Sequence, residues 1–328
     1  MADMTKKQRV RAALAGRPVD HVPVSLWGHD FLREWSPAEL AEATLEAYRA
    51  YDWDFIKLNP RATYFAEAWG NAYERPREQH QPRLIAAAVS SAAQFAELRP
   101  VDPGDGVFAQ HLEALRLVLR AVRDDADVVF TIFSPLGVAA ELAGGVPRFL
   151  DAALEDRAAV HAGLAVITRS LADLASAALG AGAAGVFFAP LTWASHDTCS
   201  TEFYRELGRP YDLQVLHHAR AAEFNILHVC RNHNMLPMLL DYPVAAFNWA
   251  DHGPGNLSLA EAKERTKKAV MGGVDQARLH LMNPREALQQ AREALAVGAD
   301  RLFLTGGCAI RPETPAENRR ALVEAARG

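Results

Sequence analysis

The chain has 328 residues, of which 50% are hydrophobic and 23% charged, so it is long and apolar enough to bury a large core. Its formal net charge of -5 gives no electrostatic reason to expect nucleic-acid binding. We expect no membrane-spanning segment, because no apolar run approaches the roughly 20 residues required. Residues 1–7 precede no apolar stretch, so we expect no signal peptide. Three cysteines are too few for a disulfide framework and indicate a reducing compartment, the cytoplasm.

Strands and helices are predicted to alternate along the whole chain. The strands are apolar runs bounded by turn residues, at 21–27, 54–59, 128–133, 185–189, 226–230, 245–250, 269–274 and 301–305. The helices lie around these strands, at 6–15, 37–50, 108–123, at two places between 134 and 184, at 201–222, at 258–268, and from 283 and 314 onward. Residues 61–94, rich in aromatic and charged side chains, predict an elaborated loop over one end. This order predicts a single (β/α)₈ TIM barrel over residues 1–328, with an N-terminal helical extension.

Potential metal ligands lie where the fifth and eighth predicted strands end. His228 and Cys230 are two residues apart, so on a strand their side chains point the same way. Cys308 follows Gly306-Gly307 at the end of the eighth strand. In a TIM barrel the carboxyl ends of all strands open on one cavity, so these three residues are expected to meet. One imidazole and two thiols occupy three corners of a tetrahedral zinc site, and the open fourth corner indicates a catalytic zinc.

This set of ligands favours chemistry on a thiol. Two thiolates and a neutral histidine leave the zinc centre with a formal charge near zero, and a third thiolate from a substrate makes it negative. The metal lowers the pKa of the bound thiol, and the excess negative charge keeps its sulfur nucleophilic. Three histidines would instead favour formation of hydroxide from water. We therefore expect alkylation of a thiol, with no side chain required as a base in the transfer step.

Further candidates lie at the carboxyl ends of the first, second and sixth strands. The expected substrate-binding residues are His29, Lys57, Asn59 and Trp249. Two interpretations of Asp251 and His252 stay open: a catalytic role facing the substrate, or capping of the loop after the sixth strand. Cys199 has no comparable partner and is interpreted as structural, since free cysteines are usually small buried hydrophobic residues. The glycine pairs 272–273 and 306–307 are expected to allow tight turns rather than to bind phosphate.

The spacing His228-x-Cys230 with a distant Cys308 resembles the zinc motif of methyltransferases in the uroporphyrinogen decarboxylase superfamily. Similar segments extend over most of the chain, at residues 9–14, 16–24, 51–57 and 311–318. The resemblance implies a methyl donor that is a methylated corrinoid (methylcobalamin) carried by a separate corrinoid protein. It also implies a small-molecule thiol acceptor, as in the coenzyme M methyltransferases, although some relatives use a folate.

Two departures separate the chain from the decarboxylases of the superfamily. Residues 26–33 lack the Arg-Gln-Ala-Gly-Arg stretch that follows the first strand in those enzymes, and Cys308 stands where their histidine near the last strand falls. The resemblance therefore favours the zinc-dependent methyltransferases. Two alternatives stay open: a cofactor-free decarboxylase of the uroporphyrinogen type, and a non-catalytic corrinoid- or metal-binding barrel. The oligomeric state is open as well.

Overall fold

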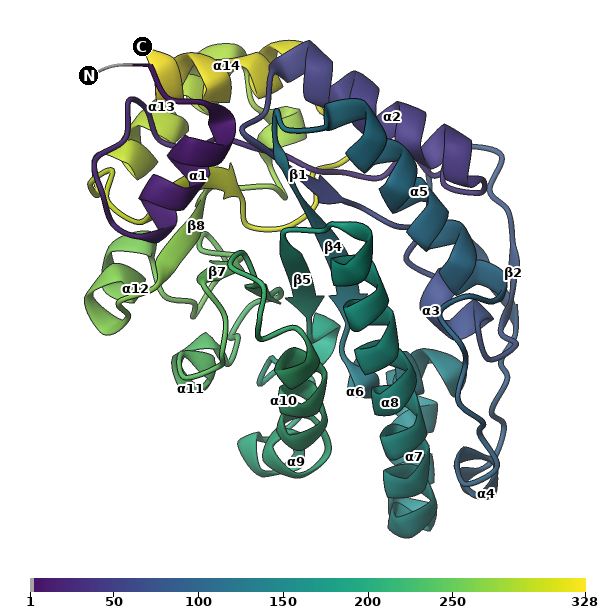
Figure 1. The fold of residues 1–328 in the computed structure, drawn as a ribbon. Helices are drawn as coiled ribbons and strands as arrows, with labels where there is room; N and C mark the ends of the chain where they lie inside the picture. The colour runs from purple at the N-terminus through teal and green to yellow at the C-terminus, as the bar shows by residue number, and fades with distance from the viewer. Residues whose placement is uncertain (1–2) are drawn as a thin grey trace.

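A computed structural model describes residues 3–328, so Met1 and Ala2, at the start of the segment expected not to be a signal peptide, lie outside the described residues. A curved parallel sheet with helices on its outer face forms the body of the protein (Figure 1). Its seven strands lie in the order β1 (Phe55–Leu58), β4 (Asp127–Phe133), β5 (Gly185–Ala189), β6 (Ile226–Val229), β7 (Ala246–Trp249), β8 (Ala269–Val274) and β9 (Leu302–Gly306). Every residue of these strands is buried, as expected for a parallel sheet covered on both faces.

The helices follow the predicted order, but three lie between 134 and 184 where two were predicted, a short one at Leu236–Leu239 was not predicted, and one predicted helix is divided in two. They are α1 (Lys6–Leu14), α2 (Pro37–Tyr51), α3 (Tyr64–Glu67), α4 (Ala92–Phe95), α5 (Gly106–Val122), α6 (Pro135–Leu142), α7 (Val146–Glu155), α8 (Arg157–Ala181), α9 (Thr201–Leu207), α10 (Arg209–His218), α11 (Leu236–Leu239), α12 (Leu259–Arg265), α13 (Pro284–Leu295) and α14 (Ala316–Arg327), with 3₁₀ turns η1 (Leu191–Trp193) and η2 (Leu279–Leu281). The single helix expected over 201–222 is divided at Gly208 into α9 and α10. Pro210 explains the break, because proline has no N–H and is tolerated only in the first turn of a helix.

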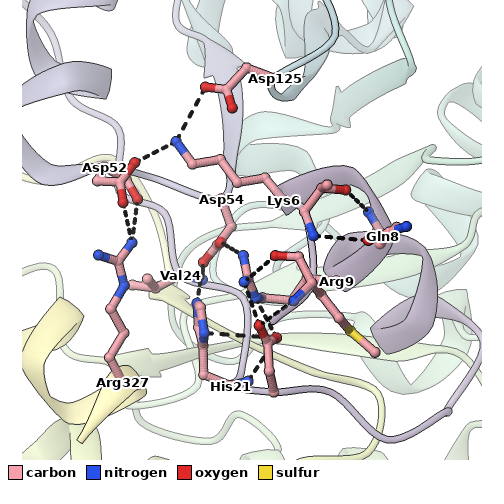
Figure 2. A network of polar contacts seen from close by, with 12 residues as sticks. Lys6, Gln8, Arg9, His21, Val24, Asp52, Asp54, Asp125 and Arg327 are labelled. Carbon is pink, nitrogen blue, oxygen red and sulfur yellow. Dashed lines mark hydrogen bonds and ion pairs between the residues drawn. The ribbon is translucent and has the colours of Figure 1, made fainter. Parts of the chain in front are cut away.

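The expected first strand is the main difference from the prediction. Residues 22–28 lie between β9 and β1, but they form only isolated bridges, from Val24 to Leu304 and from Gly28 to Ile310. The Val24 N–H donates to the Asp54 carboxylate (2.7 Å) instead of to a neighbouring strand, while the Val24 carbonyl accepts from the Asp54 N–H (2.9 Å). This segment therefore takes the eighth position of the barrel with side-chain bonds replacing part of the backbone ladder (Figure 2).

Helix α1 closes the end of the barrel at which the strands begin (Figure 1). Val10 and Ala13 are fully buried in one cluster with Phe55, Ile226 and other residues from the starts of strands. The opposite end, where the strands finish, is the barrel mouth. The segment expected as an elaborated loop contributes there, with a hairpin of β2 (Ala72–Glu74) and β3 (Arg83–Ala86) flanked by α3 and α4.

By length and composition, α8 is long and apolar enough to cross a membrane, so the expectation that no segment approaches that size is wrong. Of its most apolar window, however, 56% is buried inside the protein. Leu164, Ile167 and Leu171 are fully buried in the same core as the strands. The apolar length of α8 is thus accounted for by its place in the helical layer around the sheet.

Candidate functional site

A cavity of about 1300 Å³ opens at the barrel mouth. His228 at the end of β6, Cys230 just beyond it and Cys308 after β9 all line this mouth cavity, as expected from a barrel. A second cavity of about 570 Å³ lies behind residues 25–29, against α2. The two share a wall that includes His29 and Lys57. The sequence-predicted metal ligands are therefore accessible from one solvent-filled space at the functional end of the fold.

His228 is held in the form that binds metals. Its Nδ1 lies 2.6 Å from Asn248 Oδ1, and the Asn248 amide nitrogen donates to the carbonyls of Met271 and Gly306, both at 3.0 Å. Since these two carbonyls fix which end of the amide donates, Oδ1 must accept, and His228 Nδ1 carries the proton. Burial lowers the pKa of His228 to about 4, so the ring is neutral with a free lone pair on Nε2.

Cys308 is in direct contact with the Nε2 lone pair of His228. Its thiol donates to His228 Nε2 over 3.4 Å, and burial raises the pKa of the Cys308 thiol. The Cys230 thiol donates instead to the Leu191 carbonyl (3.2 Å), and burial, aided by Cys308, raises its pKa to about 12. Across residues 3–328 no three His, Cys, Asp or Glu side chains are clustered as a finished metal site. The structure thus joins His228 to Cys308 and leaves Cys230 on the same cavity wall, bound to a carbonyl.

The donor set nevertheless fits a soft divalent cation. Two thiols and one imidazole with a free lone pair are zinc ligands, and a cation would reverse the effect of burial on the thiol pKa values. A thiolate has no proton to donate, so metal binding would release Cys230 from the Leu191 carbonyl. The backbone on both sides of that hydrogen bond is strained, with positive φ at Leu191 (57°) and Arg231 (75°). Strain at non-glycine residues is typical of functional sites.

The glycines before Cys308 allow close approach of strands. A Cβ on Gly307 would lie 2.5 Å from the Trp249 carbonyl oxygen, so only glycine fits between β9 and β7 here. Gly272 and Gly273 lie within β8 rather than in a turn, and Gly273 has a φ of 100°. Their expected role in tight turns is therefore wrong for 272–273. The glycines permit backbone packing around the site.

Lys57, Asn59 and His29 line the mouth cavity as the sequence predicts. The Lys57 ammonium donates to Asn59 Oδ1 and lies 4.7 Å from the centre of the Phe187 ring. Burial lowers the pKa of Lys57 to about 7, while Cys308 and Glu34 act in the opposite direction. His29 Nδ1 lies 2.8 Å from Glu34 Oε1, a buried carboxylate that fixes the orientation of the ring.

The remaining candidates take different places. Trp249 is fully buried, and its indole N–H donates to the Leu257 carbonyl (2.7 Å), so it packs in the helical layer and does not line the mouth cavity. Asp251 points to β8, where its Oδ2 accepts from the Gly273 N–H (3.0 Å), and burial raises its pKa to about 6. His252 lies on the cavity wall with Nε2 3.5 Å from Asp251 Oδ2.

Sequence reasoning missed Asn248, although a signal was present. An amide in the otherwise apolar strand Ala246–Trp249 requires buried hydrogen-bond partners. Its register against β6 pairs it with His228, and the sequence alone does not provide that register.

Replacement of Asn248 with Leu is expected to weaken zinc binding about 10- to 100-fold, the usual effect of removing the partner that orients a metal-ligating histidine. Leu keeps the size of the side chain but leaves His228 Nδ1 without an acceptor. Competition with a chromophoric chelator measures the affinity, and circular dichroism verifies the fold. Wild-type zinc affinity in a folded Asn248→Leu variant would show that Asn248 does not orient the histidine.

Comparisons with known proteins extend over nearly the whole chain. The methylcobamide:CoM methyltransferase MtaA of Methanosarcina barkeri is 26% identical over 348 residues, covering 99% of this chain and 98% of the relative. The methylcobamide:CoM methyltransferase MtbA of Methanosarcina acetivorans is 21% identical, covering 100% and 99%. The solved structure of a methyltransferase from Methanosarcina mazei superposes with a TM-score of 0.86 at 25% identity, covering 99% of this chain and 98% of that one. The structure of a B12-independent methionine synthase from Shewanella shares the fold, with a TM-score of 0.58 at 14% identity, covering 92% and 96%.

The match to a family model is equally extensive. The model for uroporphyrinogen decarboxylase (URO-D) matches residues 5–328, which include residues 22–28, the seven strands and all the candidate ligands. This protein therefore belongs to the uroporphyrinogen decarboxylase family.

Proposed function

We propose that this protein is a methyltransferase that moves a methyl group from a methylated corrinoid to a small-molecule thiol, with zinc held by His228, Cys230 and Cys308. The observation that carries the proposal is the direct contact of Cys308 with His228, whose tautomer Asn248 fixes for metal binding. The names of the similar methanogen enzymes support the corrinoid and the thiol, since both are methylcobamide:CoM methyltransferases.

The residues of the chain have distinct tasks in this proposal. When bound, zinc supplies a positive charge that lowers the pKa of the acceptor thiol and keeps it deprotonated at neutral pH. His228 stays neutral because it is buried, and Asn248 holds its ring in place. The Phe187 ring stacks on His228 with 5.1 Å between centroids and keeps water from that face. A cavity of about 1300 Å³ leaves room for a corrinoid presented by a separate protein at the barrel mouth.

Incubation of the zinc-loaded protein with free methylcobalamin and a series of thiols tests the proposal. We expect demethylation of the corrinoid, followed by its absorbance change, together with a methyl thioether product identified by mass spectrometry. Chelation of the metal should stop the reaction, and added zinc should restore it. Decarboxylation of uroporphyrinogen by the metal-free protein, or corrinoid binding without turnover with any thiol, would contradict the proposal.

A further inference from the structure

Glu141 is the only charged residue of α6, whose other residues are apolar or small and buried. It lines the mouth cavity, and its Oε2 is buried with no hydrogen-bond partner among the residues that the structure describes. A carboxyl oxygen buried without a partner is costly, and such atoms are rare in native proteins, while Glu141 as a whole is partly exposed. Glu141 is therefore placed to bind a polar group of a ligand in the cavity.

A second polar group lies beside Glu141. Tyr73 of β2 lines the same cavity, and its hydroxyl oxygen accepts from the Asn71 amide (3.1 Å) with one lone pair, which leaves the second lone pair able to accept from a ligand. Asn71 also donates to the Glu141 carbonyl (2.8 Å), which fastens the β2–β3 hairpin to α6. The pKa of Tyr73 is raised to about 12, mainly by burial and further by the nearby charge of Glu141. Glu67, the other acid near Tyr73, is already paired with Arg61 (2.7 Å).

This pair lies on the same wall as the candidate zinc ligands. Gly137 precedes Glu141 by one helical turn and also lines the cavity. A Cβ on Gly137 would lie only 2.9 Å from the Leu191 side chain, so α6 packs tightly on Leu191. The Leu191 carbonyl in turn accepts from Cys230. Cys230 and α6, which carries Glu141, are therefore linked through Leu191 in the lining of one cavity.

Building on the proposed methyl transfer, we propose that Glu141 and Tyr73 bind the ammonium group of the thiol acceptor, so that the acceptor is an aminothiol. A carboxylate in a poorly solvated wall attracts a cation more strongly than it would in water. Without a ligand, burial raises the pKa of the Glu141 carboxyl to about 8. A bound ammonium group would lower that pKa again, because a nearby positive charge favours the ionised carboxylate. An anionic acceptor would form no such ion pair, and Glu141 would then stay protonated.

Calorimetric titration of the zinc-loaded protein with three two-carbon thiols tests this assignment: cysteamine, 2-mercaptoethanol and coenzyme M, which carry a cationic, a neutral and an anionic end. We expect cysteamine to bind at least about tenfold more tightly than 2-mercaptoethanol, the size of one charge-assisted hydrogen bond, and coenzyme M to show no such gain over 2-mercaptoethanol. At pH 7 the cysteamine complex should release about one more proton than the 2-mercaptoethanol complex, because Glu141 becomes ionised when the ammonium group binds.

The Glu141→Gln variant should lose both the preference and the extra proton while keeping its fold, since glutamine has the same shape and removes a buried acid. Glu113→Gln, an exposed glutamate on α5, is the matched control and should behave as wild type. Equal affinity for the three thiols in both proteins would overturn the aminothiol assignment and leave the proposed methyl transfer standing. An effect of Glu141→Gln on methylcobalamin binding alone would also overturn it, by assigning the carboxyl to the corrinoid. Failure of every thiol to bind would overturn the assignment together with the proposed function.

Discussion

Replacement of Cys308 with Ser is expected to lower zinc affinity and methyl transfer by at least about 100-fold, because loss of a direct ligand costs no less than loss of an outer partner. A serine hydroxyl does not ionise near neutral pH, so it cannot replace a thiolate as a ligand for zinc. The Cys308 sulfur also lies 3.4 Å from His228 Nε2, so it is the candidate metal ligand in direct contact with the lone pair of that histidine. Zinc content after dialysis and the rate of methylcobalamin demethylation measure the two losses.

Cys199→Ser provides the matched control. The Cys199 thiol is also held by a carbonyl, that of Trp193 at 3.3 Å, and burial likewise raises its pKa, to about 11. It does not line the mouth cavity, so its replacement should leave zinc content and rate unchanged. Equal effects of the two substitutions would mean that Cys308 acts through packing alone. Retention of wild-type zinc by a folded Cys308→Ser variant would remove Cys308 from the metal site.

The fold and the place of the candidate metal ligands at the barrel mouth were predictable because both depend on local patterns. Buried parallel strands are continuous apolar runs, and the structure confirms the strand positions from β1 to β9 in the sheet. The period of two placed His228 and Cys230 on the same side of the chain, and both line the cavity. The direction of the Cys230 thiol was not predictable. It depends on the end of β6 at Val229 and on the positive φ of Arg231, which turn the chain beside Leu191.

The roles of residues that depend on contacts with other strands could not be predicted from the sequence. In a strand buried on both faces, alternation does not show which side faces the barrel interior, and Trp249 was assigned to the wrong side. Asn248, its neighbour, is the residue that faces inward to His228. Glu141 was missed for a related reason, since its isolation becomes visible only when α6 and the β2–β3 hairpin are placed around the cavity.

Residues 22–28, the segment between β9 and β1 that closes the barrel, were expected to form a strand. Side-chain hydrogen bonds there replace part of the backbone hydrogen bonding of a strand. Proline at position 23 removes one backbone donor, and Asp54 instead accepts from the Val24 N–H with one oxygen. Its other oxygen accepts from Arg9 Nη1 (2.6 Å), and Arg9 also binds Asp20 through two bonds of 2.7 Å (Figure 2). Helix α1, which carries Arg9, is thus fastened through Asp20 to the start of the segment that closes the barrel and through Asp54 to the residue before β1.

Replacement of Arg9 with Met is therefore expected to destabilise the fold by about 3–5 kcal/mol, the cost of leaving one partner of a buried ion pair behind. The Asp54 side chain is 0% exposed and that of Arg9 only 7%, so water cannot replace the lost contacts. Arg11→Met on the same helix is the control. Arg11 is 56% exposed and lies 3.5 Å from Glu223, so its loss should change stability by no more than about 0.5 kcal/mol.

Urea denaturation at falling pH provides an independent check of the other ion pair of Arg9, the one with Asp20. The Arg9 guanidinium holds the pKa of Asp20 well below its usual range, so this contribution to stability is present above the unfolded pKa near 4. As the pH falls below about 4, the unfolded state takes up the proton first and the contribution is progressively lost. The difference between wild type and Arg9→Met should therefore be constant from pH 7 to pH 5 and shrink below pH 4. A difference that does not change down to pH 2 would assign the effect of Arg9 to the packing of its aliphatic chain, and the barrel would then be closed by apolar contacts rather than by this ion pair.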